Sequence, residues 1–500
     1  MTSASVSVEG GLLEVPAPDA SGVRAFKGIP YAAPPVGPLR WRPPQPVVAW
    51  SGARAVKAFG PNSMQGVVFD DIDPSVAGVS EDCLYLNVWT PAVGDGRVLP
   101  VMVWIHGGGF AVGSGAEPRY DGANLAARGI VVVTVNHRLN ALGFLAHPEL
   151  TAESPLHASG NYGMLDLIAA LKWAARNIDA FGGNPGEVTI AGESAGSIAV
   201  SALMASPLAH GLFKRAIGES GAMFPSPGRT AAGLAEAERA GLEFARKAGA
   251  KTLAELRSKS AEDILAANPG MGFWPIVDGS FLSRSPAAIF ADGAQNDVAL
   301  LAGWNKDEGF NFTLLSGADG QSPYADRVRA IFGARADEAL ALYPAGAPSL
   351  DKKSARQLGG DLTIIHATWA WLEMQRKTGV SEIYRFRFDH APRLPDDWFQ
   401  HAPTAEAGAF HAAEILYVFN NLHAFPWLIS EEDRRVADLI SNYWLNFIKT
   451  GDPNGAGLPP WPSYRRSDNA FMVIDVAAEV RPDEDRVRQA FLARAARPPG

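Results

Sequence analysis

The sequence predicts an α/β fold, with a mainly parallel central sheet flanked by helices and large loops between the elements. Two apolar runs, Val101–Ile105 and Ile130–Val135, have the composition of strands buried on both faces of a sheet. Apolar residues then recur at helical spacing from Met164 to Ile178, and a third strand is expected at Val188–Ala191. Strands that alternate with helices form parallel sheets, whose functional residues gather at the carboxyl ends of the strands.

A single domain is expected over residues 1–500. The 37 prolines and 51 glycines are spread along the chain, and no linker, internal repeat or long charged run divides it. Apolar residues make up 47% of the sequence, which is ample material for one core. Later runs at Val298–Ala302 and Ile383–Phe388 are expected to extend the same sheet.

The charge and the cysteine content exclude several classes of function. The chain carries 44 Lys and Arg against 53 Asp and Glu, a net charge of −9, so nucleic acids and anionic membrane surfaces are poor partners. Cys83 is the only cysteine, so no intrachain disulfide can form. The first residues show no signal peptide, and the longest apolar runs are far shorter than the ~18 residues of a membrane span. A soluble, cytoplasmic protein is therefore expected, as a monomer or a homodimer.

The most informative motif is Gly192-Glu193-Ser194-Ala195-Gly196, which directly follows the third strand. A turn this sharp from strand to helix holds the serine in strained backbone geometry. Gly192 and Gly196 must then lack side chains so that strand and helix can approach closely. The hydroxyl projects above the sheet, beside the free amides of the helix N-terminus. Ser194 is therefore predicted to be a nucleophile.

A serine at its free pKa is a weak nucleophile, so Ser194 needs a base, and that base needs an orienting carboxylate. In enzymes with this turn the chain order is serine, acid, histidine, which leaves five histidines to consider. His411 is preferred because it lies in a small-residue stretch that suits a mobile base. The others, interpreted as surface residues, are His366, His390, His401 and His423.

The acid is expected after the strand at Val298–Ala302, where the following turn contains Asp307 and Glu308. Adjacent side chains point in different directions, so only one of the two can face the histidine. The pattern of residues does not separate them, and a solvated acidic turn is the competing interpretation.

The run His106-Gly107-Gly108-Gly109 follows the first apolar strand. Acyl transfer builds negative charge on a carbonyl oxygen, which preorganised backbone N–H groups stabilise. Glycines let the backbone approach the substrate closely, and the N–H of Ala195 is a further donor. A nucleotide-binding loop is not supported, because neither G-x-G-x-x-G nor a following Gly-Lys-Ser/Thr is present. His106 is expected to brace this loop through a hydrogen bond.

No metal or other cofactor is predicted. His411 and Glu414 form an i, i+3 pair, but the chain has no H-E-x-x-H motif and no paired cysteines. The expected chemistry needs only the side chains and backbone amides already named.

Longer motifs extend this pattern over nearly the whole chain. They are Phe26–Ala32, Glu81–Pro91, the triple glycine, Gly160–Gly163, Phe181–Pro185, the serine motif, Gly451–Asn454 and Trp461-Pro462. Together they resemble the type B carboxylesterases, a cholinesterase-like branch of the α/β-hydrolase fold that includes bacterial para-nitrobenzyl esterases. The resemblance implies a serine carboxylic-ester hydrolase that forms an acyl-enzyme intermediate on small-molecule esters, without a cofactor.

The resemblance also implies roles for single residues. The family's acid is the glutamate of an Asp-Glu-Gly turn, which matches Glu308. Its histidine, in Gly-x-x-His-x-x-Glu, matches His411. Its oxyanion donors match the N–H groups of Gly108, Gly109 and Ala195.

Two supporting residues follow from the same resemblance. Glu193 matches an acidic position beside the histidine, where it would stabilise the imidazolium cation. Ser220 matches a buried serine that supports the acid. It is not expected to be a second nucleophile, because Ala222 interrupts the Gly-x-Ser-x-Gly pattern.

Two departures from the family pattern bear on location and substrate. Secreted members pair the equivalent of Cys83 with an earlier cysteine, where this chain has Phe59–Met64, which favours an intracellular bacterial-type enzyme. The loop Val67–Ser80 lacks the tryptophan with which cholinesterases stack choline, so choline esters are not expected. Phe69 is the nearest aromatic residue, and the loop charges, interpreted as solvated, are Asp70, Asp71 and Asp73.

Bulky apolar residues are frequent around the motifs, and about half are expected to line a substrate cavity. Phe110, beside the triple glycine, is expected to contact substrate. No cluster of Arg or Lys near the motifs indicates a clamp for a carboxylate, so broad activity on neutral, short-to-medium acyl or aromatic esters is expected. An amidase, thioesterase or acyltransferase with the same triad, or a non-catalytic interaction module, is the alternative. The bulky residues are Phe110, Phe144, Met223, Phe224, Phe273, Trp274, Phe310, Phe312, Trp398 and Phe399.

Overall fold

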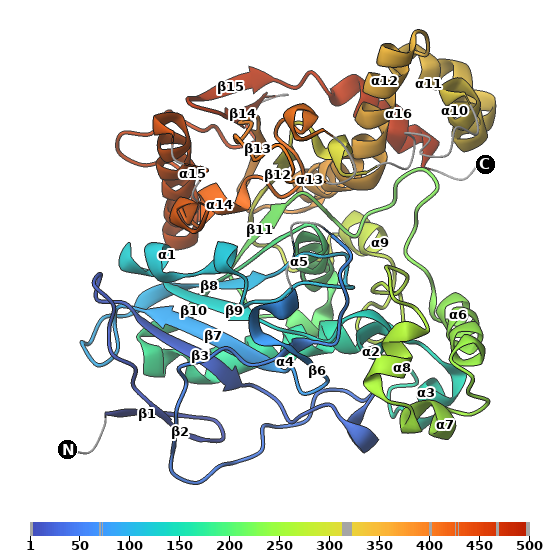
Figure 1. Cartoon of the computed structure of the whole chain (residues 1–500). Helices are drawn as coiled ribbons and strands as arrows, with labels where there is room; N and C mark the ends of the chain where they lie inside the picture. The colour runs from blue at the N-terminus through green and yellow to red at the C-terminus, as the bar shows by residue number, and fades with distance from the viewer. Residues whose placement is uncertain are drawn as a thin grey trace.

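A ten-stranded sheet runs through the molecule in the computed structural model (Figure 1). The structure describes residues 4–69, 72, 74–312, 323–399, 403–425, 427–428, 430–466 and 470–496. Six successive strand pairs, from β9 through β8, β10, β11, β12 and β13 to β14, are parallel. The pairs at the two ends, β3 with β7, β7 with β9, and β14 with β15, are antiparallel. The predicted mainly parallel sheet is confirmed.

The five strands expected from the sequence are all present in this sheet, as β8, β9, β10, β12 and β13. The sheet order is β15 (Ala478–Pro482), β14 (Ala470–Ile474), β13 (Ile383–Phe388), β12 (Ala299–Asn305), β11 (Arg215–Glu219), β10 (Gly183–Glu193), β8 (Leu99–Ile105), β9 (Val131–Val135), β7 (Tyr85–Thr90) and β3 (Arg24–Pro30). Smaller sheets join β1 (Ser5–Val8), β2 (Gly11–Glu14) and β4 (Ala53–Arg54), and β5 (Asn62–Ser63) with β6 (Val79–Ser80).

Helices cover both faces of the sheet, so its central strands are buried on both sides. Along β8, Val101, Val103 and Ile105 pack into the core layer that contains α4 and α5. Met102 and Trp104 alternate with them and pack into the opposite layer, against α15. This alternation of side chains across one strand explains why the run is apolar throughout.

The helix predicted around Met164 to Ile178 is α4. The α-helices are α1 (Ala123–Ala127), α2 (Asn140–Phe144), α3 (Pro148–Glu153), α4 (Tyr162–Asn177), α5 (Ala195–Ala205), α6 (Leu234–Lys247), α7 (Leu253–Ser258), α8 (Ala261–Ala266), α9 (Pro286–Ala291), α10 (Tyr324–Phe332), α11 (Ala336–Leu342), α12 (Pro348–Gly360), α13 (His366–Thr378), α14 (Ile415–Val418), α15 (Glu431–Thr450) and α16 (Arg486–Ala495). A π-helical segment, Asp361–Ile365, lies between α12 and α13.

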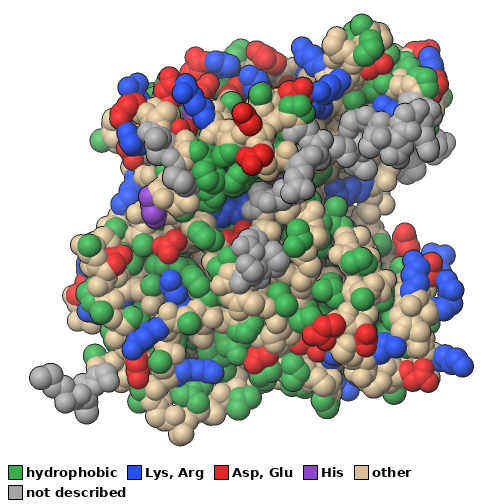
Figure 2. All heavy atoms as spheres, viewed as in Figure 1, with side chains coloured by type: hydrophobic (Ala, Val, Ile, Leu, Met, Phe, Trp, Pro, Cys, Tyr) green, Lys and Arg blue, Asp and Glu red, His purple; other side chains and the backbone are tan. Residues whose placement is uncertain are grey.

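The long helix α15 has a clear signal at each end. Ser430 and Asp433 form a capping box at its start, and Gly451 ends it in the left-handed conformation with φ 82°. Its apolar stripe packs on β8 and β10, while charged residues of both signs remain outside. Figure 2 shows acidic and basic side chains intermixed over this face of the molecule, so the net charge is not gathered there in one patch.

The turn from β10 into α5 brings the helix onto the backbone of β8. A Cβ atom built on Gly196 would lie 2.0 Å from the carbonyl oxygen of Ile105, far inside van der Waals contact. A Cβ on Gly192 would lie 2.6 Å from the carbonyl carbon of Gly196. Both glycines are therefore required by the close approach of strand and helix, as the sequence predicted.

We expect Gly196→Ala to destabilise the protein by about 1–3 kcal/mol, the usual range for overpacking, because the clashing atoms are backbone and cannot rotate away. Thermal unfolding measures this change. Gly66→Ala is the matched control, since nothing lies within 4 Å of a Cβ at that position. Equal melting temperatures for the two variants would contradict the steric argument.

Candidate active site

Ser194 lies in the turn between β10 and α5, with the strained backbone angles φ 54° and ψ −120°. Its N–H donates to the carbonyl oxygen of Glu219, at the end of the neighbouring strand β11, over 2.8 Å. Positive φ is uncommon for a residue with a side chain and persists only where the surroundings impose it. The adjacent strands therefore hold the serine at the carboxyl edge of the sheet.

His411 links the serine to a carboxylate. Its Nε2 atom lies 2.8 Å from Ser194 Oγ, and its Nδ1 atom lies 2.6 Å from Glu308 Oε2. These three side chains come from positions more than a hundred residues apart in each case, and the carboxyl edge of the sheet brings them together. The edge of the imidazole also packs against the ring of Phe312, with 5.0 Å between centroids.

The Glu308 carboxylate is held from its other side. Ser220 Oγ donates to Glu308 Oε1 over 2.5 Å, and the N–H of Asn305 donates to the same oxygen over 2.8 Å. Oε2 is thereby left for His411. Sequence reasoning assigned no role to Asn305, whose side-chain amide also donates to Glu414 and to the carbonyl oxygen of Phe410. A polar residue at the end of a buried strand was the available signal.

Asp307, the alternative acid, has a different place. It is half-buried, and its Oδ2 accepts the N–H of Ala409 over 2.9 Å. Its own N–H donates to the carbonyl oxygen of Ala409 over 3.0 Å. Gly408, with φ +60°, is needed beside it, because a Cβ there would lie 2.2 Å from Asp307 Oδ2. Asp307 therefore anchors the loop that carries the histidine.

The glycine loop after β8 leaves backbone donors free. Gly108 and Gly109 have φ values of 102° and 63°, and both line the cavity beside Ser194. Ala195 is the first residue of α5, where an N–H has no acceptor within the helix. In the part of the chain that the structure describes, none of these three N–H groups donates to a protein acceptor.

Glu193 lies on the other side of the imidazole, with Oε1 3.2 Å from His411 Nε2. Burial raises the pKa of Glu193 well above its usual range. Burial alone would lower the pKa of His411, but the Glu193 and Glu308 carboxyls reverse this and raise it above the ordinary 6.5. The site therefore stabilises a proton on this imidazole.

Two further buried carboxyls lie behind the histidine loop. Trp444 Nε1 on α15 donates to Glu219 Oε1 over 2.8 Å, while Glu219 interacts with Glu414. Burial is the main reason that the pKa of Glu414 is raised to about 7, and it raises the pKa of Glu219 well above its usual range. Repulsion from neighbouring carboxyls adds to both shifts. Glu219 was not predicted from the sequence, because the motif that contains it points only to the adjacent Ser220.

The other histidines have structural surroundings. The His106 Nδ1 atom lies 2.8 Å from the carbonyl oxygen of Gly107, its ring stacks on His137, and burial lowers its pKa to about 4. His366 and His390 are buried rather than at the surface: Nδ1 of His366 faces Gln489, and Nε2 of His390 faces Asp433. His423 is exposed. His401 lies outside the described residues.

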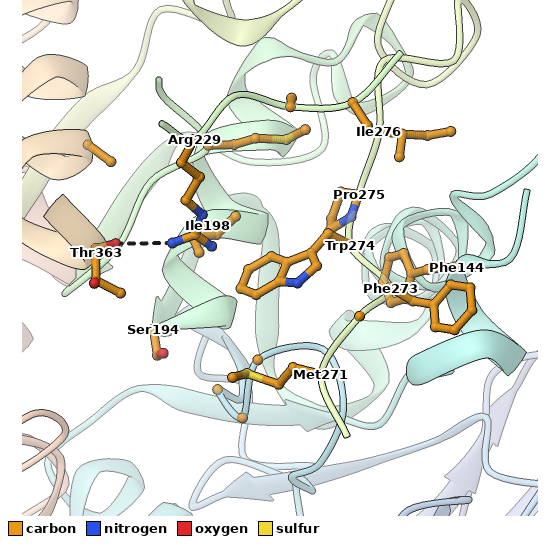
Figure 3. A pocket seen from close by; sticks show the side chains of 18 of the residues that line it. Phe144, Ser194, Ile198, Arg229, Met271, Phe273, Trp274, Pro275, Ile276 and Thr363 are labelled. Carbon is orange, nitrogen blue, oxygen red and sulfur yellow. Dashed lines mark hydrogen bonds between the residues drawn. The ribbon is translucent and has the colours of Figure 1, made fainter. Parts of the chain in front are cut away.

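A cavity of about 960 Å³ opens above Ser194 (Figure 3). Its walls come mainly from the loop around residue 69, from residues 222–276 and from the π-helical segment. Of the ten bulky residues expected near the site, Phe144, Met223, Phe224, Phe273, Trp274 and Phe312 line it. Phe69 also lines it, while Asp70, Asp71 and Asp73 lie outside the described residues.

Phe110 does not line the cavity, contrary to the expectation that it contacts substrate. Its backbone has φ 56° and its side chain is buried. The ring packs edge-on against Phe144 and Trp274, with centroid distances of 5.1 and 5.4 Å. The sharp turn after the glycines thus directs Phe110 behind the wall, where it supports two residues that do line the cavity.

Among the described residues, no group of three or more His, Cys, Asp or Glu is arranged to hold a metal ion. No helix in the described ranges is both long and apolar enough to cross a lipid bilayer.

We expect Glu219→Gln to reduce the loss of stability on raising the pH from 5 to 8. An acid whose pKa is raised in the folded state favours folding while protonated, and this contribution is lost as the pH rises through the raised pKa. Glutamine keeps an acceptor for Trp444 and gives Glu414 a neutral donor. Melting temperature against pH measures the effect.

Glu479→Gln, at an exposed carboxyl of β15, is the control for this variant and should keep the wild-type slope. If the melting temperature of Glu219→Gln fell more steeply with rising pH than that of the wild type, burial of Glu219 beside Glu414 would not be the source of the electrostatic strain.

Known proteins are similar to this chain in sequence and architecture. A model of the carboxylesterase family matches residues 3–491. The chain is 39% identical over 471 residues to fumonisin B1 esterase of Sphingopyxis macrogoltabida, covering 89% of this chain and 82% of that protein. It is 34% identical over 501 residues to para-nitrobenzyl esterase of Bacillus subtilis (strain 168), and the match covers 95% of this chain and 96% of that protein. The structure of a carboxylesterase from Geobacillus stearothermophilus matches with a TM-score of 0.83 at 35% identity, and the match covers 98% of this chain and 99% of that one. This chain belongs to the type B carboxylesterases, which are serine ester hydrolases with the α/β-hydrolase fold.

Proposed function

We propose that this esterase cleaves its substrate through an acyl-enzyme on Ser194. His411 Nε2 accepts the proton of Ser194 Oγ as that oxygen attacks the ester carbonyl carbon. Glu308 holds the imidazole in the required tautomer and stabilises its cation. The N–H groups of Gly108 and Gly109, with that of Ala195, donate to the oxyanion. The C–O bond to the alcohol then breaks, and the alcohol leaves with the proton from His411.

Deacylation repeats these steps with water. His411 takes a proton from the water as its oxygen adds to the acyl carbon, and returns that proton to Ser194 Oγ as the bond to the serine breaks. One ester and one water thus yield one carboxylic acid and one alcohol, and no cofactor takes part. The continuous hydrogen-bonded chain from Ser194 through His411 to Glu308 carries this proposal.

The proposed substrate range follows from the cavity. Its lining is mainly apolar, and an apolar wall discriminates by only ~1–3 kcal/mol for each methylene. The loop Val67–Ser80 has no tryptophan that could stack on choline, and its nearest aromatic residue is Phe69, which lines the cavity. We therefore expect broad activity on neutral, short-to-medium acyl or aromatic esters, in preference to choline esters and long-chain triglycerides.

A cytoplasmic location remains part of the proposal. Cys83, the only cysteine, is buried, and burial raises the pKa of its thiol to about 12. The fold therefore forms no intrachain disulfide. Whether the protein is a monomer or a homodimer stays open to measurement, for instance by light scattering.

We expect Ser194→Ala to lower kcat by at least ~10⁴-fold while the protein remains folded, because the nucleophile is removed. A panel of esters that varies acyl and alcohol size independently serves as the assay, with matched amides and thioesters to test the alternative activities. A fluorophosphonate should label Ser194, as located by peptide mass spectrometry. Labelling at Ser220 or Ser197, or near-normal turnover by the variant, would overturn the assignment.

We expect Glu308→Gln to lower kcat by about 10⁴-fold, because an amide facing Nδ1 favours the wrong tautomer. Asp307→Asn is its matched control. It perturbs a loop hydrogen bond worth ~0.5–1.5 kcal/mol and should cost at most about tenfold. The opposite ranking of the two variants, measured by steady-state kinetics, would transfer the role to Asp307.

A further inference from the structure

Arg229 is a cation in the wall of the otherwise mainly apolar cavity. It lies in the segment between β11 and α6, outside every motif that identifies the site. Figure 3 shows its side chain extending from its backbone segment toward Thr363, in the wall of the cavity that Ser194 also lines. A basic residue at this place bears directly on which esters the cavity accepts.

Two contacts hold the guanidinium in position. It stacks over the indole ring of Trp274, with 4.5 Å from its central carbon to the ring centroid. One terminal nitrogen donates to the carbonyl oxygen of Thr363, in the π-helical segment, over 3.3 Å (Figure 3). Stacking and one backbone bond orient the planar group while using only one of its five N–H donors.

No carboxylate of the described residues lies within 4 Å of the Arg229 nitrogens. The other cations that line the cavity are paired: Arg119 with Glu117 at 2.7 Å, and Lys247 with Glu243 at 3.6 Å. Glu236 also lines the cavity, in the first turn of α6, and forms no ion pair with Arg229. Arg229 is thus a charged donor group without a protein counter-ion in the described chain.

The surroundings of this group favour an anion. Burial lowers the pKa of Arg229, and no nearby acid compensates for the lost hydration. The residue as a whole is nevertheless exposed, so a ligand can reach it from the cavity. A guanidinium that is held in place, partly dehydrated and still accessible gains most from a ligand with two oxygens in one plane.

We propose that Arg229 binds a carboxylate of the substrate at a distance from the ester bond, so that esters with a second, free carboxylate are a substrate class of this enzyme. Monoesters of dicarboxylic acids are the simplest members. The inference rests on the proposed ester hydrolysis and extends it: neutral esters fill the apolar walls, and anionic esters add a charge-assisted contact at Arg229.

Matched substrate pairs test this proposal on the full-length chain. One pair is the 4-nitrophenyl monoester of hexanedioic acid and its terminal carboxamide, which has nearly the same shape. A second pair places the carboxylate on the alcohol, as the butanoate ester of 4-hydroxybutanoic acid and its carboxamide. The wild type should favour the carboxylate in at least one pair by about tenfold or more in kcat/KM, as charge-assisted hydrogen bonds do.

Arg229→Met keeps an unbranched side chain over Trp274 and should abolish that preference, so that kcat/KM falls more for the carboxylate than for the carboxamide. Arg229→Lys keeps the positive charge but lacks the planar guanidinium, so it should retain part of the preference for the carboxylate. Lys247→Met, which removes a different cation of the same cavity, is the control for general charge steering and should keep the wild-type ratio.

Three results would overturn the inference. They are no preference for the carboxylate in either wild-type pair, an equal loss on both members of a pair in Arg229→Met, and an equal loss of preference in Lys247→Met. Failure of the wild type to hydrolyse any ester in the panel would instead overturn the proposed function, and this inference with it.

Discussion

The close approach of α5 to the backbone of β8 is the constraint on which the site depends. Strand β10 must turn into α5 within one residue, and that residue, Ser194, takes a strained conformation as a result. The approach is possible only because positions 192 and 196 carry no side chain. It brings the start of α5 beside the glycine loop that follows β8, so the serine hydroxyl and the unpaired backbone N–H groups share one edge of the sheet. The energy that maintains this strain comes from the buried layers on both faces.

Electrostatics at this edge are unusual for a protein interior. Glu308 faces His411 and is fully satisfied by hydrogen bonds, as a carboxylate must be if it is to remain charged when buried. Glu193, Glu219 and Glu414 are less completely hydrogen-bonded, and burial raises their pKa values. The imidazole thus has the hydrogen-bonded Glu308 on one side, and near it three further acids whose pKa values are raised by burial. The carboxyls of Glu193 and Glu308 raise the pKa of His411, so this site favours a proton on the imidazole.

The cavity combines weak and strong sources of selectivity. Its aromatic and aliphatic walls favour apolar groups without a sharp choice among them. Phe110, although buried behind the wall, fixes the positions of Phe144 and Trp274. Trp274 in turn supports the guanidinium of Arg229. Contacts between aromatic rings thus connect the glycine loop to the one arginine or lysine of the wall that lacks a counter-ion within the described chain.

The sequence by itself determined the parts of this protein that depend on local backbone geometry. The turn at Ser194, the glycine loop and the apolar strands β8, β9, β10, β12 and β13 are local requirements, and each leaves a pattern in neighbouring residues. The choice of Glu308 over Asp307 came from family resemblance, because adjacent acids look alike until their directions are known. Asn305, Glu219, the direction of Phe110 and the place of Arg229 were decided only by the tertiary structure. Parallel strands bring remote segments to one edge, and cavity walls form where loops pack on one another, so neither arrangement leaves a periodic signal in the chain.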